Sequence, residues 1–178
     1  MIVEPFWLPI NESTLRQGDY LPGCPVPIPV FDPTNFGKNS EIKDVQIDLN
    51  ELDLIFLTHS CDRDNKKVAQ VVLCVIYHIS EFEENNEAFK KKGQWNEVLK
   101  GRTEGLHLLA SPTNPDNNKE SLVVNFREIQ TLPYEYVLKQ ASNLNDRWRL
   151  KSPYLEHFSQ AFARLFMRVG LPSAIPRF

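Results

Sequence analysis

The sequence predicts an α+β domain built on a small, strongly bent or closed antiparallel β-barrel, with added helices. Short β-rich segments alternate with long polar connections, prolines interrupt the first extended stretch, and one amphipathic helix stands near the C-terminus. The 178 residues are 42% hydrophobic and 24% charged, which is typical of a globular protein of one domain. We expect residues 16–136 to be mostly β, with a helical insertion near 80–101.

The N-terminal part predicts an extended but interrupted chain. We expect residues 1–15 to be irregular or extended, and Gly18-Asp19-Tyr20 to form a turn that leads into a strand. Proline has no amide proton for a β-ladder, so the following stretch is expected at a sheet edge or in a polyproline-like conformation. Five prolines carry this prediction: Pro22, Pro25, Pro27, Pro29 and Pro33. The polar residues 35–50 are expected to form a long surface loop.

Two apolar runs form the centre of the predicted sheet. Residues 52–58 are a short apolar run of the kind that is buried on both faces, and residues 68–79 are a longer β-branched one. The charged residues 62–67 between them predict a turn, so the two runs are expected to form a hairpin. Residues 121–126 predict a further strand.

Residues 80–101 predict one helix or a pair of short helices, because their apolar positions recur at helical spacing. The positions expected to be buried are Phe82, Phe89, Trp95, Val98 and Leu99.

A second helix is predicted over residues 152–170. Ser152 followed by Pro153 matches the start of a helix, and Gly170 followed by Pro172 matches an end. One face is expected to be apolar, formed by Leu155, Phe158, Phe162, Leu165, Phe166 and Val169. The other is polar, with Glu156, Gln160, Arg164 and Arg168.

Charge is distributed unevenly along the chain. The net charge is −3, but residues 147–178 carry six basic side chains and one acidic. Arginine offers a fixed pair of donors to phosphate, and aromatic rings stack on bases, so these residues form a candidate binding surface. Its members are Trp148, Arg149, Tyr154, Arg164 and Arg168. Two alternatives stay open: the arginines pair with N-terminal acids, and the aromatic rings pack under the helix.

The hairpin tip holds the densest cluster of reactive side chains, residues 58–62. Cys61 is a candidate nucleophile with His59 or His157 as its base, because a nearby imidazole lowers the pKa of a thiol. Thr58, Ser60 and Asp62 are candidate binding residues beside it. The alternative is a structural turn in which Ser60 and Asp62 bond to the backbone. Three cysteines without zinc spacing predict reduced thiols and no metal site, and no cofactor motif is present.

Residues 16–79 resemble the MazF/PemK-like small barrels. The resemblance rests on Arg16-Gln17-Gly18-Asp19-Tyr20, the proline-containing loop, the strand 54–57 that ends in Thr58, and the strand 71–76. It implies an SH3-like barrel, which in this family is often a dimer and in many members cleaves RNA as a toxin. These toxins place a catalytic arginine in an Arg-Pro pair before the central strand, where this chain has Leu52-Asp53. The resemblance therefore implies a barrel without that ribonuclease activity.

Two functions follow from these observations. The first is a binding module of the small-barrel type that recognises RNA or a protein partner, with a homodimer as a further expectation. The alternative is a cysteine-dependent hydrolase or transferase that uses Cys61 with a histidine. No apolar run approaches the roughly 20 residues of a membrane span, and no basic and apolar leader opens the sequence, so we expect a cytoplasmic protein without a membrane contact.

Overall fold

A computed structural model describes residues 6–30, 46–59, 69–144 and 146–167. Its strands are β1 (Trp7–Ile10), β2 (Asp19–Pro29), β3 (Ile47–Phe56), β4 (Gln70–His78), β5 (Leu106–Leu109), β6 (Leu122–Pro133) and β7 (Arg147–Leu150). Its α-helices are α2 (Ile79–Asn85), α3 (Gln94–Leu99), α4 (Tyr134–Ser142) and α5 (Tyr154–Phe166). Two 3-10 turns, η2 (Glu87–Lys90) and η3 (Asn118–Glu120), complete the described elements.

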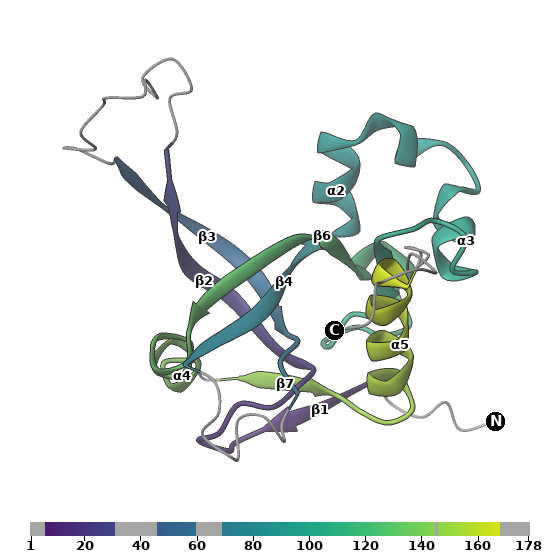
Figure 1. The fold of residues 1–178 in the computed structure, drawn as a ribbon. Coiled ribbons are helices and arrows are strands. Elements are labelled where there is room, and N and C mark those ends of the chain that lie inside the picture. The colour runs from purple at the N-terminus through teal and green to yellow at the C-terminus, as the bar shows by residue number, and fades with distance from the viewer. Residues whose placement is uncertain (1–5, 31–45, 60–68, 145, 168–178) are drawn as a thin grey trace, which may run out of the picture.

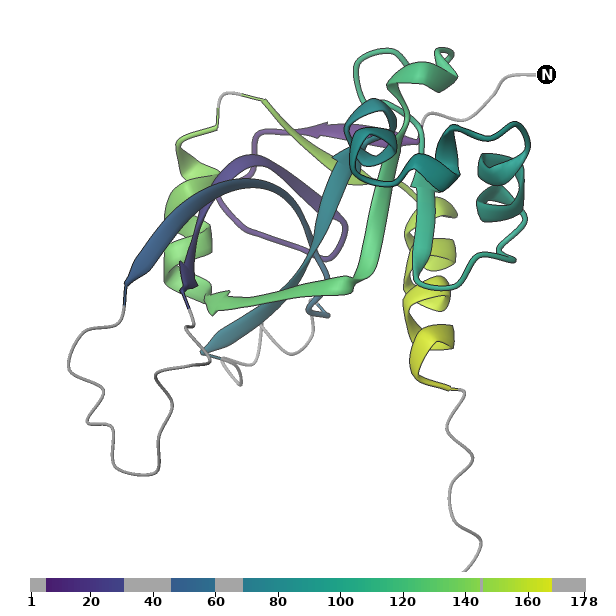
Figure 2. The same ribbon diagram turned by 90° about the horizontal axis from the view of Figure 1, so that it is seen from above.

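The α+β class is confirmed, with all the strands in one antiparallel sheet. The strand order is β1-β7-β2-β3-β4-β6-β5, so the outer strands β1 and β5 do not pair with each other and the described sheet is open. Figure 2 shows that β2, β3, β4 and β6 curve strongly, with α4 beside the inside of the curve. In Figure 1, α4 lies at one end of these strands and the helices α2 and α3 at the other.

The central strands are buried on both faces, as the sequence predicts. Leu54 and Phe56 belong to one apolar core, and Ile55 and Leu57 belong to the other. The first core lies within the curve of the sheet and includes Val137 and Ala141 of α4. The second lies under α5, which contributes Phe158. The predicted hairpin is also present, since β3 and β4 pair antiparallel with Ile55 opposite Cys74.

The prolines of β2 lie on the half of the strand that has one neighbour. β7 reaches only Asp19 and Tyr20, whereas β3 pairs with β2 as far as Pro29. Val30 N–H donates to the Gln46 carbonyl at 2.9 Å, so the even-numbered residues direct their amides at β3 and the odd-numbered ones direct theirs away. Pro25, Pro27 and Pro29 therefore remove no ladder bond, and they leave the free edge without donors. The predicted edge position is therefore met at these three prolines, whereas Pro33 lies outside the described residues.

The helical insertion is divided into α2, η2 and α3, which agrees with a pair of short helices. Phe82 and Val98 are buried as expected, and Phe89 and Trp95 pack against them. The expectation for Leu99 is wrong, because its side chain is 73% exposed at the last position of α3. The helix ends before a further turn could cover that residue.

Two elements near the C-terminus differ from the prediction. Residues 134–142 form α4, although the sequence favours strand there, because Val137 and Ala141 lie four residues apart and bury one helical face. β7 was also not predicted. It pairs with β1 from Trp7–Leu150 to Ile10–Arg147 and so joins both ends of the described chain.

The last helix is shorter at its start than predicted. It begins at Tyr154 with Pro153 as the flanking residue, and no side chain caps it, so Ser152 does not serve as the cap. Phe158 is buried and Leu155, Phe162 and Leu165 pack beside it, as expected. Phe166 is 56% exposed, which contradicts its predicted burial, since the sheet does not extend beneath the end of the helix. Arg168, Val169 and Gly170 lie outside the described residues.

Candidate functional site

The predicted cysteine site falls mostly outside the described residues, which exclude Ser60, Cys61 and Asp62. His59 is exposed just after β3. Thr58 has a structural role, since its Oγ1 accepts the Val72 N–H at 2.8 Å. The cysteine-dependent enzyme stays a prediction.

The two described cysteines are buried and ill suited to act as nucleophiles. Burial raises the pKa of the Cys24 thiol to about 11 and that of Cys74 to about 12. A thiol with so high a pKa holds little thiolate near neutral pH. The prediction of reduced thiols is met at Cys24 and Cys74, which the structure describes as free.

His107 lies on β5 and His157 lies on α5. His157 is exposed on α5, whereas His107 of β5 packs between Phe126 and Phe158, with ring centroids 6.1 and 6.0 Å away. Burial lowers the pKa of His107 to about 4, and the neighbouring His157 lowers it further. His107 is therefore neutral near pH 7 and packs, half-buried, against two core phenylalanines.

Arg149 pairs with acids from the N-terminal part of the chain. Its Nη2 lies 3.1 Å from Asp19 Oδ2, its Nε donates to Asp19 Oδ1, and its Nη1 lies 3.2 Å from Glu12. Burial opposes the charge of Arg149, but the bonds to Asp19 and Glu12 outweigh it and raise the pKa. Arg147 also approaches Asp19, at 3.6 Å. These contacts hold β1, β2 and β7 together.

The aromatic members of the predicted surface pack against other rings and the core. Trp148 is half-buried against the core under α5, and Tyr154 stacks on Phe6 with centroids 3.6 Å apart. Of the predicted binding residues that the structure describes, Arg164 is exposed and lines a hollow.

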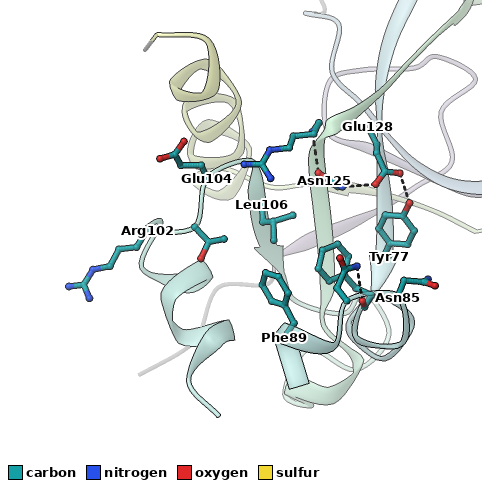
Figure 3. A pocket seen from close by; sticks show the side chains of 12 residues that line it. Tyr77, Asn85, Phe89, Arg102, Glu104, Leu106, Asn125 and Glu128 are labelled. Carbon is teal, nitrogen blue, oxygen red and sulfur yellow. Dashed lines mark hydrogen bonds between the residues drawn. The ribbon is translucent and has the colours of Figure 1, made fainter. Parts of the chain in front are cut away.

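A larger cavity, of about 670 Å³, lies between the helical insertion and the ends of β4, β5 and β6 (Figure 3). Phe82 and Phe89 come from the insertion, Leu106 from β5, and Tyr77 from β4. β6 contributes Asn125, Arg127 and Glu128, and further lining comes from Asn85, Asn86, Arg102, Thr103 and Glu104. The size is that of a pocket for a small ligand or one residue of a polymer.

A bulge in β6 builds the polar wall of this cavity. Cys74 of β4 pairs with Ile129, but its neighbour Val75 pairs with Asn125, so residues 126–128 are extra in β6. Such bulges change the direction of side chains beside functional sites. Here Asn125 Nδ2 donates to Glu128 Oε1 at 2.6 Å, and the Arg127 N–H donates to Asn125 Oδ1 at 3.2 Å.

Tyr77 completes this wall from β4. Its hydroxyl donates to Glu128 Oε2, so each carboxylate oxygen of Glu128 accepts one hydrogen bond from the protein (Figure 3). Burial raises the pKa of Tyr77, and the bond to Glu128 raises it further. Tyr77 thus stays protonated and fixes the carboxylate.

Aromatic residues of the helical insertion form another wall: Phe82 and Phe89 line the cavity, and Trp95 packs against them without lining it. Phe82, Phe89 and Trp95 pack against one another with centroids 5.0 to 5.8 Å apart. Trp95 Nε1 donates to Glu83 at 2.7 Å, which ties the α3 ring to α2. Phe89 lies at the cavity with Leu106 beside it (Figure 3).

Two arginines flank the turn at residues 101–105. The Arg127 side chain lies over Gly105, where an added Cβ would meet its Nε at 3.0 Å. Arg164 of α5 lines a smaller hollow of about 100 Å³ that shares Thr103, Glu104 and Leu106 with the large cavity. Within the described part of the chain, no carboxylate pairs with Arg127 or Arg164. Arg102 bonds to Glu97 at 3.2 Å and extends away from Phe89 and Leu106 (Figure 3).

Residues 6–30, 46–59, 69–144 and 146–167 contain no group of three or more histidines, cysteines or acids placed to hold a metal ion. Over the same residues, no helix has the length and apolar character that crossing a membrane requires.

Sequence reasoning finds Arg164 and misses Tyr77, Asn125, Arg127 and Glu128. One signal was present: Asn125 interrupts the apolar run 122–126, and Arg127 and Glu128 follow it directly. This interruption does not by itself indicate a bulge, because a bulge is defined by the partner strand, which the sequence does not show. No family model matches this chain, and no curated protein matches it as a relative.

Proposed function

We propose that the protein is a non-catalytic module that binds single-stranded RNA, with one base in the large cavity. The observation that carries this proposal is the pairing of an aromatic and amide-lined cavity with two arginines that lack a carboxylate partner in the described structure.

The chemistry of the cavity fits an unpaired base. Proteins recognise single-stranded RNA by stacking splayed bases on aromatic side chains and bonding to their edges. Phe89 offers the ring, and the amides of Asn85, Asn86 and Asn125 each retain one N–H for a ligand beside their bonds within the protein. Arg127 and Arg164 lie where the phosphates on either side of that base would pass, since both flank the same turn.

The fold is consistent with the proposal at a coarser level. The sheet is antiparallel and curved, and Gly18 and Asp19, which carry the resemblance to the SH3-like MazF/PemK barrels, stand at the start of β2; kinship with those barrels is part of the proposal. Where those toxins carry the Arg-Pro pair, this chain has Leu52-Asp53, and Asp53 accepts from the Tyr20 hydroxyl at 2.5 Å and from the Gly23 N–H at 2.8 Å. Asp53 thus organises a bulge in β2, and this supports binding without ribonuclease activity.

A titration of a fluorescein-labelled single-stranded RNA of ten nucleotides, followed by anisotropy, tests the proposal. We expect saturable binding that weakens with salt, with a slope of about −0.7 per phosphate contacted. Arg127→Ala is expected to weaken binding about fivefold and to make the slope shallower, because one charged contact is lost.

Lys139→Ala is the matched control. Lys139 is exposed on α4, at the other end of the curved strands from α2 (Figure 1), so its loss removes one charge but no contact. Equal losses of RNA affinity in the two variants would mean that the change in net charge alone explains the effect of Arg127→Ala. Absence of binding to any RNA would overturn the proposal and favour a protein partner. The same samples in an analytical ultracentrifuge test the expected homodimer, whose mass is twice that of the 20.6 kDa chain.

A further inference from the structure

We infer that Glu128 selects guanine as the base that enters the cavity, an inference that rests on the proposed RNA binding. The carboxylate lies in the polar wall with Tyr77 and Asn125, and the aromatic wall that contains Phe89 lines the same cavity.

The carboxylate is fixed before a ligand arrives. One oxygen accepts from Asn125 at 2.6 Å and the other accepts from Tyr77, and these two partners come from different strands. A carboxylate has about four acceptor positions, so each oxygen retains one for a ligand. A ligand that carries two adjacent donors can therefore use one acceptor position on each oxygen.

Guanine is the base that supplies such a pair. Its Watson–Crick edge carries N1–H and the N2 amino group next to each other, whereas adenine and cytosine place an acceptor beside their amino group. Uracil has one N–H between two carbonyl oxygens. Asn125 cannot replace Glu128 as the acceptor of this pair, because its amide has a single acceptor oxygen and that oxygen already accepts the Arg127 N–H.

A protein arginine side chain also presents two parallel donors, but the surroundings disfavour it. Arg127 lies on Gly105 at the same cavity, and no described carboxylate neutralises it. Arg102 lines the cavity as well, although its guanidinium bonds to Glu97. Glu104 and Glu128 also line the cavity, but a second guanidinium meets repulsion from Arg127, whereas a neutral base does not.

The test uses three labelled RNAs of nine nucleotides, all uridine except for the central position, which is guanosine, inosine or adenosine. Inosine keeps N1–H but lacks the N2 amino group, so it removes one donor from the ligand without any change to the protein. We expect guanosine to bind about tenfold more tightly than adenosine, with inosine between them. In Glu128→Gln this order is expected to disappear, since an amide offers one acceptor and one donor.

The outcomes separate the inference from the proposed function. Equal affinities for the three RNAs, with the Arg127→Ala loss still present, would overturn guanine selection and leave RNA binding in place. No binding of any of them would overturn both. The inosine comparison is made on the wild-type protein, so a folding defect in Glu128→Gln cannot imitate the expected result.

Discussion

Asp19 is the residue on which the charge arrangement of the N-terminal strands depends. The Asp19 side chain is 0% exposed. It accepts hydrogen bonds from the Arg149 guanidinium and lies near Arg147, which is 4% exposed. It also accepts the Arg16 N–H at 3.0 Å. The sequence allows two alternatives for Arg149, phosphate binding or internal pairing, and the choice between them required knowing that β2 and β7 are neighbours.

Asp19→Asn is expected to lower the free energy of unfolding by about 3–5 kcal/mol, because it leaves buried guanidinium groups without a full counter-charge. Glu12→Gln is the control from the same network. The Glu12 carboxylate that pairs with Arg149 is exposed, so its substitution is expected to lower the free energy of unfolding by less than about 1 kcal/mol. Urea denaturation followed by circular dichroism measures both, and similar losses would contradict the structural role given to Asp19.

His107 makes stability depend on pH. Its folded pKa of about 4 lies below the ordinary 6.5, so the unfolded chain binds a proton more readily between those values. Stability is therefore full above about pH 6.5 and falls as the pH drops toward 4, by at most about 3 kcal/mol. In His107→Gln this part of the pH dependence is expected to vanish. An unchanged urea midpoint profile in the variant would show that another group is responsible.

At the scale of elements, Gly18 joins β2, β7 and α5. It has φ +86°, and an added Cβ would meet Leu155 Cδ1 at 2.8 Å and Leu150 Cβ at 3.1 Å. Its N–H donates to the Phe56 carbonyl at 2.8 Å, and its carbonyl accepts from Leu150 N–H at 3.0 Å. The chain turns here in contact with three other elements, β3, β7 and α5.

Gly18→Ala is expected to lower the free energy of unfolding by about 2–4 kcal/mol. This is the sum of the cost of a left-handed backbone at alanine and the cost of an overpacked contact. Gly23→Ala separates the two causes, because Gly23 has φ +58° and nothing within 4 Å of an added Cβ. Only the backbone cost of about 1–2 kcal/mol is expected there. Thermal unfolding compares the variants, and equal losses would mean that the Leu155 and Leu150 contacts adjust without cost.

The sequence predicts well those elements that have a strong local pattern. The spacing of apolar residues predicts the β3–β4 hairpin and the face of α5 that packs on the core. The missing amide proton of proline predicts the unpaired edge of β2. Sequence reasoning fails at α4 and β7. Tyr134 and Tyr136 favour a strand by propensity, but burial of Val137 against the inner core selects a helix.

For the whole molecule, the candidate site depends on contacts that are remote in sequence. Tyr77 and Glu128 are 51 positions apart, and Arg127 and Arg164 lie on different elements around one turn. The sequence places the basic residues of a binding surface near residues 147–168, whereas Arg149 is paired internally and only Arg164 of the described members reaches the cavity region. Long-range pairing of β4 with a bulged β6 is what assembles the rest.

Ultraviolet cross-linking of a single-stranded RNA to the protein, followed by mass spectrometry of the attached peptides, tests the central claim most directly. The account predicts cross-links to peptides that contain Tyr77, Phe89 or residues 122–128, which line the cavity, and their loss in Arg127→Ala at moderate salt. Cross-links confined to Trp148 or Tyr154, or cross-links that Arg127→Ala leaves unchanged, would contradict it and return the binding surface to the aromatic residues around β7.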